Sequence, residues 1–182
     1  MYDDGLYQLA EQQFNLFLQR YAESDFAEEA EFLHGESLFN QQKYGQAITS
    51  YKKLMRAYSA IDLRDKAQFR IGQAYYYSER YKEAASALRQ FINRYENSTL
   101  RDQGFYWLGE ALYQVGETEE AIQRYAEVFG RYPQSSLADY SLYSVGWIFE
   151  EKKDFKRALA AYERLMRDYP ASDLAPQAAY HA

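Results

Sequence analysis

A 37-residue period runs through the sequence and constrains the fold more than any other feature. Glycines recur at this interval, at Gly35, Gly72, Gly109 and Gly146. Twelve residues after each glycine stands an alanine, and this column also extends back to Ala10: Ala47, Ala84, Ala121 and Ala158. Two aromatic columns repeat with the same spacing, at Tyr21, Tyr58, Tyr95, Tyr132 and Tyr169, and at Phe32, Phe69, Tyr106, Tyr143 and Tyr180. A fixed period of this length indicates a chain of stacked structural repeats.

Each repeat has the pattern of two amphipathic helices. In the copy from 136 to 172, apolar residues recur at steps of three and four, first over 137–149 and again over 155–169. This is the spacing of one helical face. The second run ends at Pro170, which cannot continue a helix. Serines precede the next first helix, where we expect their hydroxyls to cap free backbone amides: Ser98, Ser135 and Ser172.

Composition supports an all-helical chain and excludes several classes of protein. Val, Ile and Thr together number 12 of 182 residues, too few for a sheet protein. No cysteine is present, so disulfides, thiolate nucleophiles and cysteine-ligated metals are excluded. The net charge of −6 argues against a nucleic-acid partner. No apolar run approaches the roughly 20 residues of a membrane helix, so we expect no direct membrane insertion in this segment.

The glycine column predicts close helix packing. A glycine inside a helix costs roughly 0.5–1 kcal/mol relative to alanine, so four in register need a compensating reason. We expect Gly35 on the first helix and Ala47 on the second to let the two helices touch. Large aromatics such as Tyr51 and Tyr58 are then expected to fill the splayed ends of the pair. One pair cannot bury its second face alone, so neighbouring repeats should stack.

These columns resemble the tetratricopeptide repeat family. The resemblance rests on Leu108-Gly109, Leu112, Ala121, Tyr125 and Pro133 in one copy, and on Val145-Gly146, Phe149, Ala158, Tyr162 and Pro170 in the next. It implies an all-α fold, a right-handed α–α superhelix of about ten antiparallel helices. The period of 37 exceeds the usual 34, and the longer connections resemble those of bacterial periplasmic members such as the Tol-Pal-associated coordinator and the outer-membrane assembly lipoprotein. That likeness implies a periplasmic or outer-membrane-associated location, with the cytoplasm as the alternative.

The period also predicts how the chain is divided. We expect one tetratricopeptide array over 1–182, with full repeats at about 26–61, 62–98, 99–135 and 136–172. Half repeats at 1–25 and 173–182 flank them. A chain that opens inside a second helix and stops inside a first helix is expected to be a fragment of a longer protein.

The sequence offers no catalytic, cofactor or metal site. His34 falls in a column otherwise held by apolar residues, so we interpret it as a partly buried packing residue. His181 has no His or Cys partner at ligand spacing. The clusters Glu28-Glu29-Glu31 and Glu150-Glu151 could be imagined as paired carboxylates, but a solvated helix face is the simpler interpretation. Phosphate loops and hydrolase motifs are missing from the sequence, so we predict that the protein is not an enzyme.

In the tetratricopeptide family, the first helices line a concave wall from which binding residues project. Transferred by column, the resemblance points to a partner-binding groove formed by Phe69, Arg70, Gln73, Tyr76, Tyr106, Trp107, Glu110, Tyr113, Tyr143 and Trp147. Aromatic and arginine side chains are common binding hot spots, so an extended or helical peptide is the expected ligand. The alternative for the column of Phe69 is simple packing between adjacent helices.

Two functional hypotheses follow from the sequence. The first is a protein-binding scaffold that takes a protein or peptide partner in the aromatic groove. The second is an oligomerisation module whose exposed end repeats mediate self-association. Glu36, Gln73, Glu110 and Trp147 occupy the position at which some chaperone-binding members carry an asparagine for a peptide carboxylate, so recognition of a C-terminal carboxylate is disfavoured.

Overall fold

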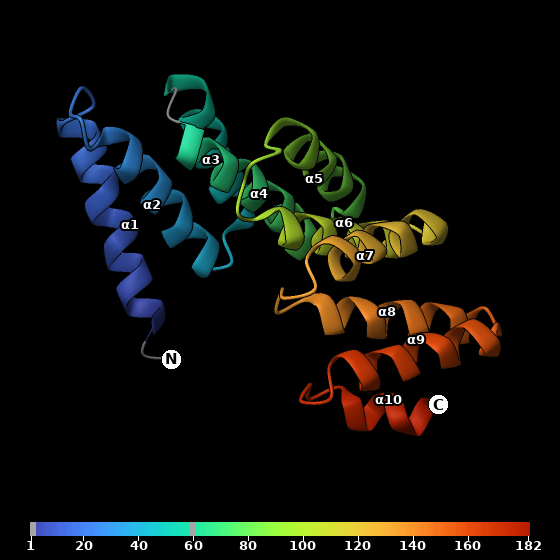
Figure 1. The fold of residues 1–182 in the computed structure, drawn as a ribbon. Helices are drawn as coiled ribbons and strands as arrows, with labels where there is room; N and C mark the ends of the chain where they lie inside the picture. Colours follow the sequence, from blue (N-terminus) through green and yellow to red (C-terminus); the bar gives the residue numbers. More distant parts are fainter. Residues whose placement is uncertain (1–2, 59–60) are drawn as a thin grey trace. The chain divides into compact units, whose positions relative to one another are not determined.

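The computed structural model describes residues 3–58 and 61–182, and within these ranges every regular element is an α-helix. Figure 1 labels the helices in chain order. Their bounds are α1 Asp3–Arg20, α2 Ala27–Asn40, α3 Tyr44–Ala57, α4 Ile61–Tyr77, α5 Tyr81–Arg94, α6 Arg101–Gln114, α7 Thr118–Arg131, α8 Ala138–Glu151, α9 Phe155–Asp168 and α10 Ala175–His181. The all-α fold class expected from the sequence is therefore confirmed.

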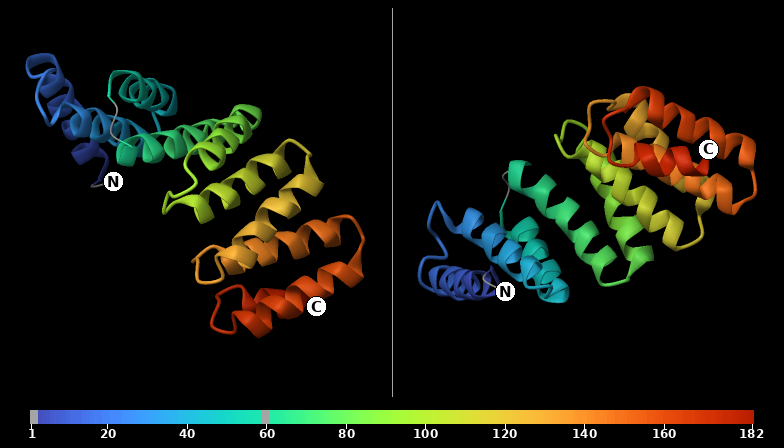
Figure 2. Two further views of the ribbon diagram at one scale, coloured as in Figure 1. Left: turned by 45° about the horizontal axis from the view of Figure 1, so that its top comes forward. Right: turned by 90° about the horizontal axis from the view of Figure 1, so that it is seen from below.

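The chain forms two compact units, Met1–Ser98 and Thr99–Ala182. The first contains α1 to α5 and the second α6 to α10. In each unit every helix packs against the next one along the chain. Figures 1 and 2 show these neighbours as antiparallel hairpins joined by short connections.

The glycine column makes room for a ring from the second helix of the same repeat. A Cβ added at Gly109 on α6 would lie 2.7 Å from Cε1 of Tyr125 on α7, and Tyr125 is only 1% exposed. The same contact joins Gly35 to Tyr51 and Gly146 to Tyr162, while Gly72 faces Leu88. The expectation that Tyr51 fills a splayed helix end is therefore wrong, because its ring lies directly against the glycine.

The hairpins of α2–α3, α4–α5, α6–α7 and α8–α9 turn through a left-handed residue at one position of the period. Over 3–58 and 61–182, the residues with positive φ are Gln42, Glu79, Gly116 and Lys153. The amide of the following residue then bonds to a carbonyl five residues earlier, as Glu117 does to Leu112 at 2.9 Å. This is the bond pattern that satisfies the free carbonyls at a helix C-terminus. The backbone path of the turn thus repeats although its side chains differ.

The serine column closes the connections between repeats. The Ser135 hydroxyl accepts a bond from the Leu137 amide at 3.2 Å and donates to the Asp102 carboxylate at 2.5 Å. Ser98 donates likewise to Asp65 at 2.6 Å in the first unit. Leu137, the residue just before α8, makes no side-chain cap bond. Ser135 and Ser172 therefore accept a hydrogen bond from a free backbone amide before the next first helix, as expected, and in addition tie the connection to the start of the preceding first helix.

Candidate protein-binding surfaces

The ten residues expected to line a groove all lie on first helices, namely α4, α6 and α8. Phe69 and Gln73 are only 3% and 6% exposed, so their side chains offer almost no surface to a partner. The Phe69 ring instead packs on Phe91 of α5, with ring centroids 5.5 Å apart. The remaining side chains are at least partly exposed: Arg70, Tyr76, Tyr106, Trp107, Glu110, Tyr113, Tyr143 and Trp147.

In the first unit, Arg70 is held by its own neighbours. Its Nε and Nη2 atoms donate to the two carboxylate oxygens of Glu36 on α2, at 2.9 and 2.8 Å. Its guanidinium also lies over the ring of Phe39, 5.0 Å from the centroid. The Tyr51 hydroxyl donates a short hydrogen bond to the same glutamate. Arg70 is therefore neutralised within the chain and is a poor clamp for an anionic ligand.

An aromatic cluster stands next to Arg70 at the ends of α2 and α4. The Tyr77 ring, 44% exposed, stacks on Tyr44 at 5.7 Å and meets Phe39 edge-on at 5.8 Å. Tyr76 contacts both Tyr77 and Tyr81. Tyr76 was expected here from the sequence but Tyr44 was not, because Tyr44 begins the second helix and only folding brings it beside the first helices.

The second unit carries the larger set of expected residues, which we call the α6–α8 surface: Tyr106, Trp107, Glu110, Tyr113, Tyr143 and Trp147. On α6, Tyr106 meets Trp107 edge-on at 5.8 Å and Tyr125 at 5.9 Å. The Tyr113 hydroxyl donates to Glu151 of α8 at 2.6 Å. On α8, Trp147 is 40% exposed. This surface is aromatic and acidic, and its rings are fixed by contacts from neighbouring helices.

Tyrosine hydroxyls from the second helices bond to two glutamates, Glu110 of this surface and Glu150 at the end of α8. Tyr125 donates to Glu110 at 2.8 Å, and Tyr162 donates to Glu150 at 3.0 Å. Burial raises the pKa of both tyrosines, and the charge of the adjacent glutamate raises it further. The hydroxyls therefore stay protonated as donors, and each fixes one carboxylate.

Two interpretations of charged residues need correction. Glu31 does not belong to a solvated face: it is 2% exposed, its Oε1 accepts from Ser50 at 2.9 Å and its Oε2 from Lys53 at 2.5 Å. Glu150 is also partly buried, and it contacts the Nδ1 atom of His181 at 3.0 Å. His34 is partly buried as expected, within 3.1 Å of the Ser50 hydroxyl, and burial lowers its pKa.

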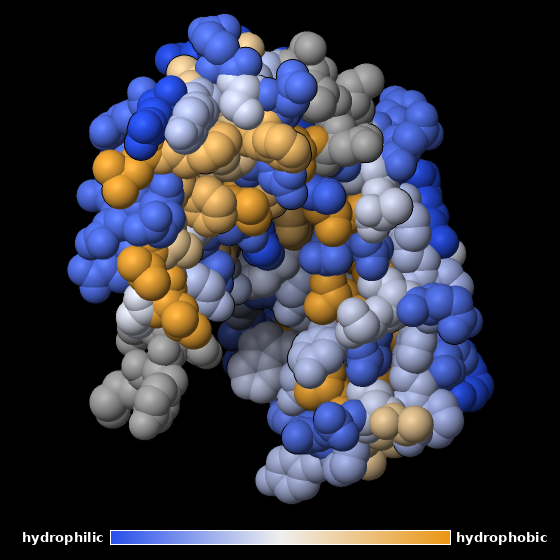
Figure 3. Space-filling view, turned by 90° about the vertical axis from the view of Figure 1, so that its left-hand side faces the viewer, coloured by the Kyte–Doolittle hydropathy of each residue, from blue (hydrophilic) through white to orange (hydrophobic). Residues whose placement is uncertain are grey.

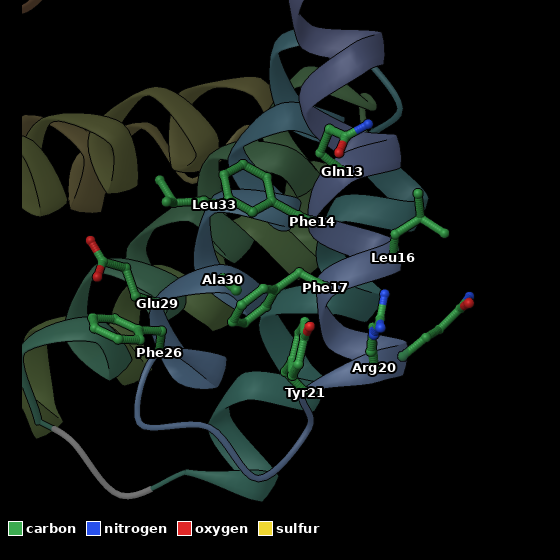
Figure 4. Close-up of a pocket in the computed structure, with 11 residues that line it drawn as sticks. Gln13, Phe14, Leu16, Phe17, Arg20, Tyr21, Phe26, Glu29, Ala30 and Leu33 are labelled. Carbon is green, nitrogen blue, oxygen red and sulfur yellow. The ribbon is translucent and has the colours of Figure 1, made fainter.

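A pocket lies between α1 and α2 in the first unit, and sequence reasoning missed it. Figure 4 shows Phe14 and Phe17 of α1, together with Tyr21 just beyond its end, facing Phe26 and Leu33 across it. The space measures about 760 Å³. Leu6, Leu9 and Leu16 on α1 are more than half exposed. Figure 3, which faces the side of Figure 1 on which α1 lies, shows hydrophobic side chains among hydrophilic ones at the surface.

Within the described ranges, no group of three or more His, Cys, Asp and Glu side chains is arranged to hold a metal ion. Likewise, none of the helices in that part of the chain has the length and apolar character needed to cross a bilayer.

Residues 32–181 match the family model YfiO, described as an outer membrane lipoprotein. The chain belongs to the YfiO family. The match covers most of the chain, including part of the first unit, nearly all of the second and the whole α6–α8 surface. No curated protein sequence matches this YfiO-family chain.

Solved structures show the same fold. MamA superposes with a TM-score of 0.77 and 19% identity, over 92% of this chain and 91% of MamA. YrrB, described as a TPR protein with an unusual peptide-binding site, superposes with a TM-score of 0.73 and 19% identity, over 95% and 84%. The C-terminal part of a TPR repeat-containing protein from Cytophaga hutchinsonii gives a TM-score of 0.73 and 20% identity, over 96% and 67%. The resemblance to the tetratricopeptide repeat family is therefore confirmed, and these structures share the fold of this chain.

Proposed function

We propose that this YfiO-family chain is a non-catalytic scaffold that binds an extended peptide or protein segment on the α6–α8 surface. The observation that supports this proposal is the exposure of Trp147. This side chain keeps 40% of its surface exposed, on a first helix whose other large apolar side chains are mostly buried. Trp107, Tyr113 and Tyr143 lie partly exposed on the same set of helices. Rigid aromatic side chains lose little conformational entropy on binding, so they are efficient anchors for a partner.

The proposed setting is the cell envelope, in the periplasm or at the outer membrane. The support is the YfiO match, because the family is described as an outer membrane lipoprotein. Fractionation of the native host, with an antibody against this chain, tests this location. Recovery with the cytoplasmic proteins alone contradicts it.

The binding surface is tested by photo-crosslinking in the native host. A benzoylphenylalanine is placed at Trp147, and in a second variant at Leu159 of α9, which is similarly exposed at 37%. We expect a discrete crosslinked partner from position 147 only. Affinity for that partner is then measured with Trp107→Ala combined with Tyr113→Ala, and a loss of at least tenfold is expected. Equal crosslinking from both positions, or unchanged affinity of the double variant, rejects this surface.

A second candidate function is head-to-tail self-association, favoured by an unmatched pair of rings. In complete repeats the aromatic column of the first helix packs on a ring of the second helix, as Tyr143 does on Tyr162 at 5.6 Å. Tyr180 on α10 occupies this column but is 88% exposed. Phe14 on α1 stands 37 residues before Tyr51 and lines the pocket between α1 and α2. We propose that Tyr180 of one copy packs on Phe14 of another.

This second candidate is tested by sedimentation over a concentration series. Tyr180→Ala should shift the chain towards monomer, whereas Phe155→Ala, at a site also well exposed, should not. A heterologous contact of this kind does not close on itself, so the expected wild-type species grow steadily with concentration. A wild-type chain that remains monomeric at millimolar concentration contradicts the proposal.

A further inference from the structure

His181, in the last turn of α10, lies among aromatic rings and one carboxylate that come from α8 and α9. Its ring meets two rings of α8 edge-on, Trp147 at 6.0 Å and Tyr143 at 6.2 Å between centroids. The ring of Tyr162 on α9 lies 5.5 Å away. The two carboxylate oxygens of Glu150 on α8 lie 3.0 and 3.3 Å from Nδ1 of His181. We call these five side chains the His181 cluster.

The carboxylate determines which nitrogen of His181 carries a hydrogen. An ionised glutamate accepts hydrogen bonds and donates none, so Nδ1 is the donor in the contact with Glu150. A second proton on the ring is then added at Nε2. Glu150 also accepts from the Tyr162 hydroxyl at 3.0 Å, and burial raises the pKa of that hydroxyl, which keeps it a donor. Protonation of His181 therefore adds a positive charge without breaking either bond to Glu150.

The surroundings of His181 favour a positive ring over a neutral one. The charge adds an ion-pair attraction to the existing hydrogen bond with Glu150. Aromatic faces attract a cation within about 6 Å of their centroid, and the rings of Tyr162 and Tyr180 both lie at 5.5 Å. Among the described contacts of His181, the titratable groups are Glu150 on α8, Tyr143 on α8, Tyr162 on α9 and Tyr180 on α10 itself. None of these groups carries a positive charge.

We propose that a proton on His181 regulates the α6–α8 surface by fixing the orientation of Trp147. The inference rests on the proposed function of that surface and concerns its regulation. The link is direct, because the imidazole that takes up the proton contacts the indole on which the proposed function depends. A positive ring is held more firmly by Glu150, so α10 stays against α8 and the indole keeps one orientation. A preorganised anchor loses less entropy on binding, so the partner binds more tightly at lower pH.

The chain supplies matched controls for this proposal. Only two histidines occur in the sequence, and the other one, His34, lies on α2 in the first unit. His34→Gln and His181→Gln therefore remove the same titrating group at two places. The chain also has only two tryptophans, and Trp107 on α6 serves as the internal reference for Trp147. Histidine is the side chain that ordinarily changes charge between about pH 5 and pH 8, so this range tests the proposal.

The first experiment follows the indole N–H resonances of the whole chain by NMR between about pH 8 and pH 5.5. We expect the Trp147 resonance to move with a single midpoint and to move further than that of Trp107. His181→Gln should abolish this movement, whereas His34→Gln should leave it unchanged. Glu150→Gln should reduce it, because the positive ring then lacks its carboxylate partner.

The second experiment separates a fixed indole from one that merely senses a nearby charge. Acrylamide quenching of Trp147 fluorescence, measured in a Trp107→Phe background, reports how freely the indole meets the solvent. We expect weaker quenching at pH 5.5 than at pH 8, and equal quenching at both pH values when His181→Gln is added. A Trp147 resonance that does not titrate, a response that survives His181→Gln or is lost in His34→Gln, or quenching that is independent of pH overturns the inference.

These two measurements need no partner, so they decide the proton effect even if crosslinking from position 147 rejects the scaffold function. For a partner identified by that crosslinking, we expect an affinity about fivefold higher at pH 5.5 than at pH 8, the scale by which a charged group strengthens one hydrogen bond. His181→Gln should remove this gain, and His34→Gln should not. An affinity gain of the same size in His181→Gln also overturns the inference.

Discussion

The contact between Gly109 and Tyr125 predicts that an alanine at this glycine destabilises the protein. A Cβ at Gly109 would lie 2.7, 2.9 and 3.0 Å from three atoms of the Tyr125 ring. The ring has little freedom to withdraw, because it is 1% exposed and its hydroxyl bonds to Glu110 at 2.8 Å. Overpacking a core costs about 1–3 kcal/mol. Stretching a hydrogen bond to a charged group adds about 1 kcal/mol.

The helix propensity of alanine opposes this cost. Replacing glycine by alanine inside a helix gains about 1 kcal/mol. The balance is a net loss of about 2 kcal/mol for Gly109→Ala, taking the middle of the overpacking range. Gly130 on α7 serves as the matched control, because nothing lies within 4 Å of a Cβ added there. Gly130→Ala should be neutral or stabilise the chain by up to about 1 kcal/mol.

Urea unfolding followed by circular dichroism at 222 nm measures both variants. We expect a lower midpoint for Gly109→Ala and an equal or higher one for Gly130→Ala. In a Tyr125→Ala background the ring is missing, so Gly109→Ala should no longer destabilise and a large coupling energy should appear. If Gly109→Ala raises the midpoint, or keeps its penalty without Tyr125, close approach to the ring is not the reason for the glycine column.

Three further predictions concern stability. Ser135→Ala should cost about 1 kcal/mol in urea unfolding, since it leaves the partly buried Asp102 carboxylate without its hydroxyl donor; a loss below about 0.3 kcal/mol contradicts the tie between connection and helix. Burial lowers the pKa of His34, so the unfolded chain binds this proton more readily than the folded chain. The stability that neutral His34 contributes is present above the unfolded pKa of about 6.5 and is lost as pH falls through the folded pKa. His34→Gln should therefore make the urea midpoint of unfolding less dependent on pH between pH 7 and 5, and an unchanged dependence contradicts this prediction. Burial, together with the charge of Glu110, raises the pKa of Tyr125. The stability that protonated Tyr125 contributes is therefore present below the unfolded pKa of 10.0, and it declines above that pH. Tyr125→Phe should reduce this alkaline loss of stability, and an unchanged slope of the unfolding free energy between pH 10 and 11.5 argues against the prediction.

Much of the fold was predictable because the period repeats both composition and geometry. The glycine, alanine and aromatic columns fixed the helix pairs, and the prolines at Pro133 and Pro170 stand just beyond the ends of α7 and α9. A residue type that recurs at the same position of several repeats reflects the structure that the repeats share, whereas a residue at one position can reflect a single local contact. The role of each member was harder to predict. The contact of Tyr51 with Gly35 depends on where the second helix crosses the first, and the pattern alone does not give that crossing.

The candidate surface was only partly predictable for a similar reason. Position on a helix face told which residues could point outward, and Trp147 and Tyr113 do so. Burial of Phe69 and Gln73 depends on neighbours from other helices, as the Phe91 ring shows. Glu31 was misplaced because its partners, Ser50 and Lys53, come from the following helix.

The hairpins differ in the conformational strain of their left-handed turn residues. A side chain with a Cβ pays roughly 1–2 kcal/mol to adopt this conformation, whereas glycine adopts it freely. Gln42, Glu79 and Lys153 carry this cost in their hairpins, while Gly116 relieves the hairpin of α6 and α7. The same backbone path is thus repeated four times at unequal expense. The hairpin of α6 and α7, which carries Glu110 and Tyr113, is therefore the least strained of the four. This part of the surface is held by the turn with the lowest backbone energy.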